Sequence, residues 1–126
     1  MATFTVSRTT HAIENGTAVN NGASDTGDLD LATNGYYEAN FNVTFHIASG
    51  TPSGDVTISV YQSVNSTGKL ETEPSFVTTI PFSATGDKRI FIGGIRCGYV
   101  RIKCENDTGE NGTWDLDAEG LKQVST

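Results

Sequence analysis

The sequence has little positive charge and no long hydrophobic run. Lysine and arginine total 8 against 15 acidic residues, which leaves a net charge of −7. A domain with this balance repels phosphate backbones, so we do not expect nucleic acid as a partner. The N-terminus has no basic stretch followed by an apolar run, and no segment approaches the ~20 apolar residues of a membrane span. We therefore expect a protein made in the cytoplasm, with no signal peptide and no membrane partner.

Cysteine is nearly absent, because the chain has only Cys97 and Cys104. Two cysteines are too few for a disulfide scaffold. On one extended segment they would lie about 23 Å apart and on opposite faces, whereas a disulfide needs Cα atoms within about 7 Å. The spacing predicts two free thiols.

Leucine and proline are scarce, whereas glycine, threonine, serine and asparagine are abundant. This composition favours strands joined by turns over helices. A chain of 126 residues is long enough to bury one core but not two. The sequence therefore predicts a single β domain over residues 1–126.

The clearest strand signal is residues 36–47, where apolar and polar residues alternate. A period of two indicates a strand with one buried face, with Tyr37 and Phe45 facing inward and Tyr36 and His46 facing outward. Residues 56–60 alternate in the same way after a turn-rich stretch, and the two segments together predict a hairpin.

Further strands are expected over residues 76–82, 90–95, 99–104 and 114–119. Pro81 indicates a sheet edge or the end of a strand, and Gly93 with Gly94 indicates a bulge or bend. The last two segments predict a second hairpin, with Cys104 and Trp114 in the core. The whole pattern predicts an all-β fold, a two-layer antiparallel β-sandwich of jelly-roll or Ig-like type with about seven or eight strands.

The first third of the chain is less regular. Phe4 and Val6 fit a short N-terminal strand, and Ala18 and Val19 fit a second one. Several Asn-Gly and related turn signals lie between these segments and Tyr36. We expect residues 8–35 to form an irregular arm or a long surface loop.

No arrangement of residues predicts catalysis. The only histidines, His11 and His46, are far apart in sequence, and there is no Gly-X-Ser-X-Gly elbow. Two acidic loops, residues 25–30 and 106–110, could offer oxygen ligands to calcium, but neither has EF-hand spacing, so ordinary turn acids are the favoured interpretation. The sequence predicts no catalytic residue, no metal site and no cofactor.

Three tyrosines fall at outward positions of their expected strands: Tyr36, Tyr61 and Tyr99, the last beside Arg101. Exposed aromatic and arginine side chains anchor protein partners, and exposed rings also stack on sugars. Tyrosine is equally a common strand former. We take these four residues as the candidate partner-binding set.

Three segments carry a resemblance to a known group of proteins. They are residues 54–63 (Gly-Asp-Val-Thr-Ile-Ser-Val-Tyr-Gln-Ser), 86–92 (Gly-Asp-Lys-Arg-Ile-Phe-Ile) and 98–103 (Gly-Tyr-Val-Arg-Ile-Lys). Over residues 36–121 the chain resembles small accessory virion proteins of tailed bacteriophages. The resemblance implies a non-enzymatic structural protein of the virion, a capsid decoration or cement protein that binds the outer capsid surface. It also implies the major capsid protein or another virion protein as partner, and a homo-oligomer, with a trimer suspected.

The strand Tyr99-Val-Arg101-Ile and the late Trp114 are also similar to discoidin-like and other carbohydrate-binding jelly rolls. This second resemblance implies an alternative function, a carbohydrate-binding or host-receptor-binding module of a phage tail or a glycan-active system. Our leading hypothesis is the decoration protein, with the arm at residues 8–35 and the outward tyrosines making the contacts.

Overall fold

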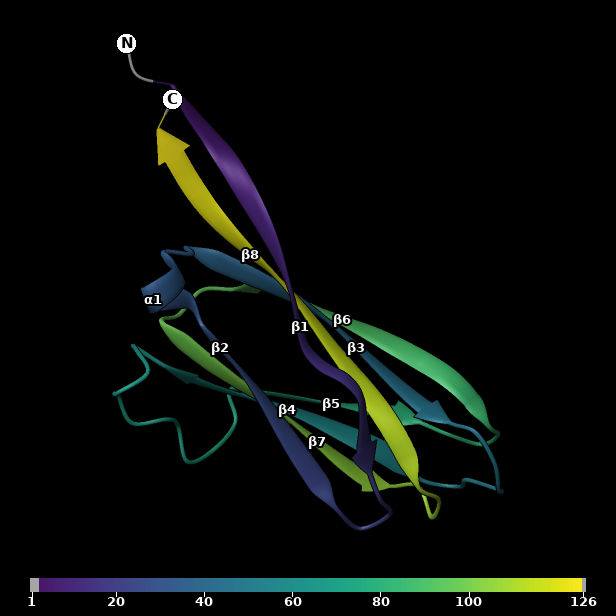
Figure 1. Cartoon of the computed structure of the whole chain (residues 1–126). Helices are drawn as coiled ribbons and strands as arrows, with labels where there is room; N and C mark the ends of the chain where they lie inside the picture. The colour runs from purple at the N-terminus through teal and green to yellow at the C-terminus, as the bar shows by residue number, and fades with distance from the viewer. Residues whose placement is uncertain (1–2, 126) are drawn as a thin grey trace.

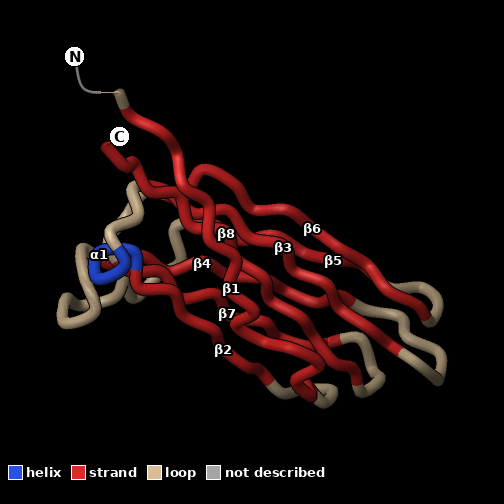
Figure 2. The backbone as a smooth tube through the Cα atoms, turned by 45° about the horizontal axis from the view of Figure 1, so that its top comes forward, coloured by secondary structure: helices blue, strands red, loops and turns tan. Residues whose placement is uncertain are grey.

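The computed structural model describes residues 3–125. Eight strands form two antiparallel four-stranded sheets that pack face to face (Figures 1 and 2). This confirms the all-β, two-layer sandwich that the alternation predicts. Sheet A contains, in spatial order, β1 (Phe4–Val19), β8 (Gly112–Ser125), β3 (Glu38–Ile47) and β6 (Gly86–Ile95). Sheet B contains β2 (Ser24–Asp30), β7 (Tyr99–Asp107), β4 (Asp55–Ser63) and β5 (Phe76–Pro81).

Consecutive strands mostly change sheets. Only β4 and β5 are neighbours both in the chain and in a sheet. This is the strand order of a jelly roll, in which connections arch over the core rather than turn back beside their own strand.

The two hairpins expected from sequence are therefore wrong. β3 lies in sheet A and β4 in sheet B, and β7 and β8 are separated in the same way. Alternation fixes which face of a strand is buried, but a strand shows the same pattern whether its successor pairs beside it or crosses the sandwich.

The core lies between the two sheets. Alternate residues of β3 from Ala39 onward are buried, as are Trp114 and Leu116 of β8 and Ile102 and Cys104 of β7. Cys104 and the half-buried Cys97 are both free thiols, as the spacing predicts. Burial raises the pKa of the Cys104 thiol to about 12.

Two local predictions from proline and glycine are confirmed. β5, which ends at Pro81, is an edge strand of sheet B. The β3–β6 register shifts from Ala39↔Ile95 to Phe41↔Ile92, so that Gly93 and Gly94 form a bulge opposite Asn40. Gly94 has a φ of 71°, a left-handed conformation that favours glycine.

The prediction of an irregular arm at residues 8–35 is wrong. Most of β1, all of β2 and a short helix, α1 (Leu31–Asn34), occupy that segment. The turn signals are local features of these elements. The register shifts in β1 fall between Ala12 and Thr17, beside Asn15-Gly16, and Gly35 ends α1 with a φ of 73°. The sequence predicted only the two ends of β1 as short strands, because the residues between them are mostly exposed and have no regular apolar alternation.

The two ends of the described chain project together beyond the sandwich (Figure 1). Residues 4–7 of β1 pair with residues 122–125 of β8, past the last β3–β8 pair at Glu38↔Leu121. We call this pair of segments the terminal ribbon. Among residues 3–125, no helix is long and apolar enough to cross a membrane.

Candidate functional site

The outer face of sheet B carries three of the four partner-binding candidates. Tyr61, Tyr99 and Arg101 stand on adjacent strands, with Tyr61 directly opposite Arg101. Asp28 of β2 lies opposite Arg101 on the other side. The Arg101 guanidinium donates two hydrogen bonds to the Asp28 carboxylate, from Nε at 2.8 Å and from an Nη at 2.9 Å. The Tyr99 hydroxyl also donates to Asp28.

These contacts occupy the polar ends of Tyr99 and Arg101. Partial burial works against the charge of Asp28, but the hydrogen bonds from Arg101 and Tyr99 hold the pKa of its carboxyl below the usual value. The same carboxylate raises the pKa of Tyr99. Bidentate arginine–carboxylate pairs of this kind are strong and geometrically fixed. The Asp28 cluster therefore stabilises this face of the sheet and leaves only Tyr61 of the set with an uncommitted polar end among the described residues.

Tyr36 lies elsewhere, and its expected orientation is wrong. Because β3 begins at Glu38, its alternation does not extend back to the two tyrosines. Tyr36 packs against the core, with its ring over Gly120, and its hydroxyl lies 2.6 Å from His11 Nε2. Tyr37, expected to face inward, is exposed instead. The structure therefore does not bring Tyr36 together with Tyr61 and Tyr99.

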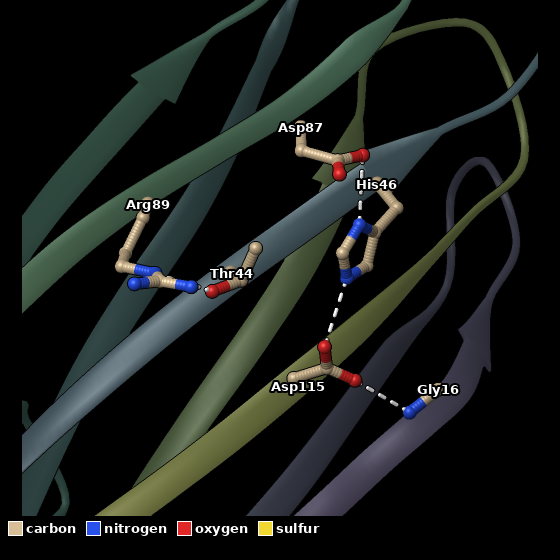
Figure 3. A network of polar contacts seen from close by, with 6 residues as sticks. All are labelled: Gly16, Thr44, His46, Asp87, Arg89 and Asp115. Carbon is tan, nitrogen blue, oxygen red and sulfur yellow. Dashed lines mark hydrogen bonds and ion pairs between the residues drawn. The ribbon is translucent and has the colours of Figure 1, made fainter.

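One half of the outer face of sheet A is a closed polar network (Figure 3). His46 of β3 lies between two carboxylates, with Nδ1 at 2.8 Å from Asp87 of β6 and Nε2 at 2.9 Å from Asp115 of β8. Asp115 also accepts a hydrogen bond of 2.6 Å from the Gly16 amide of β1. The His46 network thus joins all four strands of sheet A.

The network favours the charged imidazole, because only imidazolium can donate from both ring nitrogens at once. Hydrogen bonds to Asp115 and Asp87 raise the pKa of His46, and the bond from His46 holds the pKa of Asp115 below its usual value. Next to it, Arg89 Nε donates to Thr44 Oγ1 at 3.0 Å. Each of these polar groups is used in binding another strand, which indicates a structural role.

The other half of this face is open. A groove of about 300 Å³ crosses all four strands of sheet A. The side chains on its outer surface are Thr10 of β1, Asp117 and Glu119 of β8, Asn40 and Asn42 of β3, and Phe91 of β6. Phe91 stands directly opposite Asn42, and Asn42 directly opposite Asp117. We call this surface the sheet A groove.

Aromatic and polar groups in the groove are mostly uncommitted. Phe91 is 66% exposed. Within residues 3–125, neither Asn42 nor Asp117 has a side-chain hydrogen bond or ion pair. Glu119 differs, because Arg8 pairs with it at 2.8 Å. The groove therefore presents one ring, amides and one unpaired carboxylate to solvent.

The acids of the first candidate calcium loop point in different directions. Asp25 faces the interior and accepts a hydrogen bond of 2.9 Å from the Trp114 indole nitrogen. Asp28 holds Arg101, and Asp30 caps α1 by accepting from the Thr33 amide at 2.9 Å. The three carboxylates do not converge on a common point.

Sequence reasoning missed Phe91. It lies in the run Ile90-Phe91-Ile92, which predicts a buried strand but does not say which of three apolar residues faces outward. Since Ile92 is buried and β6 alternates, Phe91 must face solvent. The only feature of the sequence that pointed to this part of β6 was the Gly93-Gly94 pair, which predicted a bulge or bend but not an exposed aromatic residue.

Comparisons with known proteins bear on the fold. No family model matches the chain, and no curated protein matches it. Among solved structures, the PRD1 vertex protein P5 has a TM-score of 0.51 and 14% identity over 93% of this chain and 95% of that one. The dimeric latent PorU from Porphyromonas gingivalis has a TM-score of 0.56 and 9% identity over 94% of this chain. The CBM36-1 domain of a xylanase from the hindgut metagenome of Trinervitermes trinervoides has a TM-score of 0.47 and 11% identity, covering 90% of this chain and 97% of that domain.

The likenesses differ in extent. The chain spans nearly the whole of the vertex protein but only 13% of PorU. At such low identities they show the fold alone. The chain is a jelly-roll β-sandwich, with a fold similar to that of the PRD1 vertex protein P5.

Proposed function

We propose that the protein is a non-enzymatic structural component of a bacteriophage particle, one that decorates the outer capsid surface and attaches through its terminal ribbon. The observation that carries this proposal is the ribbon itself. It projects from the sandwich and exposes apolar side chains: Phe4 is 61% exposed, Val6 51% and Val124 38%. Phe4 and Val6 lie on the same face of β1, two residues apart.

A projecting two-stranded ribbon needs a partner for physical reasons. An isolated pair of strands is marginally stable in water, and exposed apolar side chains gain free energy when a partner covers them. β1 is also an edge strand of sheet A, and a long edge with unpaired backbone groups is a template for another chain. A capsid subunit or a neighbouring copy of this chain would satisfy both the side chains and the edge.

The likeness to the PRD1 vertex protein supports the same class of function. That protein matches over almost its full length, so the shared unit is the whole jelly roll rather than an inserted part. In this proposal the partner is the major capsid protein or another virion protein. The contact lies at the chain ends rather than in the arm and tyrosines suggested by the sequence.

The first test is mass spectrometry of purified virions of the phage that encodes the chain. Several copies per particle are expected, and complete absence would overturn the proposal. The second test is binding of the purified chain to particles lacking it, measured by co-sedimentation. Changing Phe4 and Val6 together to Ser should weaken binding at least about tenfold, or about 1.4 kcal/mol, because each buried apolar side chain contributes about 1.5–3 kcal/mol.

The matched control replaces two exposed valines outside the ribbon, Val64 and Val77, which are 78% and 51% exposed. The double change to Ser there should leave particle binding within about twofold of the unmodified chain. Equal loss of binding in both variants would assign the effect to general surface polarity and count against the ribbon.

A further inference from the structure

We propose that the sheet A groove is a binding site for a neutral saccharide. This site is separate from the terminal ribbon and goes beyond the structural function proposed above. The nature of the ligand follows from four features of the groove: a fixed aromatic ring, an oriented amide, an unpaired carboxylate and the absence of free positive charge among its described side chains.

The first feature is the placement of Phe91. Its ring lies over Gly93, where an added Cβ would come within 2.5 Å of Cε1 and 2.8 Å of Cζ. The ring therefore rests on glycine backbone, and Phe91 as a residue is 66% exposed. A ring held against the sheet loses little conformational entropy when a ligand covers it. Such a surface suits the apolar C–H face of a sugar ring.

The second feature is the orientation of Asn40. The amide nitrogen of Gly94, in the bulge, donates to Asn40 Oδ1 at 2.9 Å. This bond fixes the side chain and leaves its NH2 group available as a donor, since no described residue accepts from it. The bulge thus positions both the ring and an amide, and bulges often re-aim side chains next to binding sites.

The third feature is the row formed by Phe91, Asn42 and Asp117 across neighbouring strands. Directly opposite side chains in antiparallel strands lie about 4.5–5.5 Å apart at Cβ. The row therefore places an apolar surface, an amide and a carboxylate side by side. A sugar ring offers the complementary set, a C–H face with hydroxyl groups that both donate and accept hydrogen bonds.

Charge disfavours anionic ligands. None of the described side chains that line the groove is basic. Arg8, at its side, is paired with Glu119, and the neighbouring Arg89 of β6 donates to Thr44. Asp117 remains unpaired within the described chain, and the protein carries a net charge of −7. A sulfated or sialylated glycan, or a nucleic acid, would meet uncompensated negative charge. A neutral polyhydroxyl ligand can instead donate hydroxyl hydrogens to Asp117.

The experiment uses the purified full chain and a panel of neutral hexasaccharides built from glucose, xylose, mannose or N-acetylglucosamine. Isothermal titration should give saturable binding for at least one member. Backbone amide NMR should place the shifts at Asn42, Phe91 and Asp117. Sialyllactose and a heparin hexasaccharide should give no binding. No response from any neutral saccharide at about 10 mM, about 2.7 kcal/mol of affinity, would overturn the proposal, as would stronger binding of the anionic controls.

Variants separate the site from the fold. Phe91→Ala should weaken saccharide binding at least about tenfold while leaving the melting temperature nearly unchanged, and Phe91→Tyr should retain binding. The control is Phe76→Ala, another exposed phenylalanine, 47% exposed on sheet B, which should bind as the unmodified chain does. Unchanged affinity in Phe91→Ala, or shifts that follow protein concentration rather than saccharide, would overturn the proposal in favour of another surface or of self-association.

The two proposals fail independently. The Phe4 and Val6 double variant should bind saccharide normally, and Phe91→Ala should bind particles normally. Loss of both activities in one variant with an intact fold would contradict the separation of ribbon and groove.

Discussion

The outer faces of the two sheets are built from similar polar and aromatic residues, but they differ in how many of these side chains are paired with a neighbour. On sheet B, Asp28 holds both Tyr99 and Arg101, and Lys103 pairs with Glu105 at 2.6 Å. On sheet A, the half around His46 is equally paired, whereas the half around Phe91 and Asp117 is open.

The difference separates stabilising polar residues from available ones. An outward tyrosine or arginine whose hydrogen bonds are already used stabilises the sheet and has less to offer a ligand. An outward asparagine or aspartate with no partner contributes little to stability and remains free to bind. Three variants test this comparison, beginning with the largest expected change.

Removing the carboxylate at position 28 should have the largest effect on stability. Asp28→Ala takes away two hydrogen bonds from Arg101 and one from Tyr99 and leaves a half-buried guanidinium unpaired. Hydrogen bonds to charged groups contribute about 1.5–3 kcal/mol, so we expect the free energy of unfolding to fall by about 2 kcal/mol. Urea unfolding followed by the fluorescence of the single buried Trp114 measures it.

The pH dependence of this effect has a definite sign. Because the pKa of Asp28 is lowered in the folded state, its contribution is present above the unfolded value of about 4 and is lost as pH falls through the folded value. The difference between Asp28→Ala and the unmodified chain should therefore shrink in acid. A difference that is constant down to about pH 2 would contradict the assignment of the effect to this carboxylate.

Replacing His46 should have an intermediate, pH-dependent effect. The pKa of His46 is raised in the folded state, so its contribution is fully present below the unfolded value of about 6.5 and is lost as pH rises through the folded value. His46→Gln should reduce the free energy of unfolding by about 1 kcal/mol at pH 5.5 and by less at pH 9. Urea titrations at both pH values measure this.

Thr113 provides the control for His46, because it stands directly opposite His46 on β8 and has no titratable group. Thr113→Ala should show no change in its effect between the two pH values. An equal loss at both values in His46→Gln would mean that packing of the ring, rather than its charge, holds the four strands.

Removing the unpaired carboxylate at position 117 should have the smallest effect. Asp117→Ala breaks no side-chain hydrogen bond or ion pair among the described residues and lowers the negative charge of an acidic protein. We expect the free energy of unfolding to change by less than about 0.5 kcal/mol. A loss as large as that of Asp28→Ala would remove the distinction between the paired and the open surface.

The fold class was predictable because its evidence is local. The alternation in β3 and the apolar runs of β4, β6, β7 and β8 each require a buried face, and the bulge at Gly93 and the edge at Pro81 follow from backbone chemistry. β1 was not predictable in this way. It is long but exposed, and its place depends on pairing with β8, which is more than 100 residues away at Arg8↔Leu121.

The candidate site was predicted only in part. The alternation correctly predicted that Tyr61, Tyr99 and Arg101 face outward. It did not predict that Tyr99 and Arg101 bind Asp28, which comes from β2 in the segment expected to be irregular. The orientation of Tyr36 was predicted wrongly because the alternation of inward and outward residues was assumed to continue before β3 begins. Whether a polar side chain is free depends on its neighbours across the sheet, and those neighbours are distant in sequence.

The sequence by itself determined a single all-β sandwich, its main strands and its free cysteines, since burial of one face imposes a period of two on every strand. The tertiary structure decided which sheet each strand joins, which outward side chains are paired, and that the chain ends form a projecting ribbon. These outcomes depend on contacts between segments far apart in the chain, and the same local pattern is compatible with several of them.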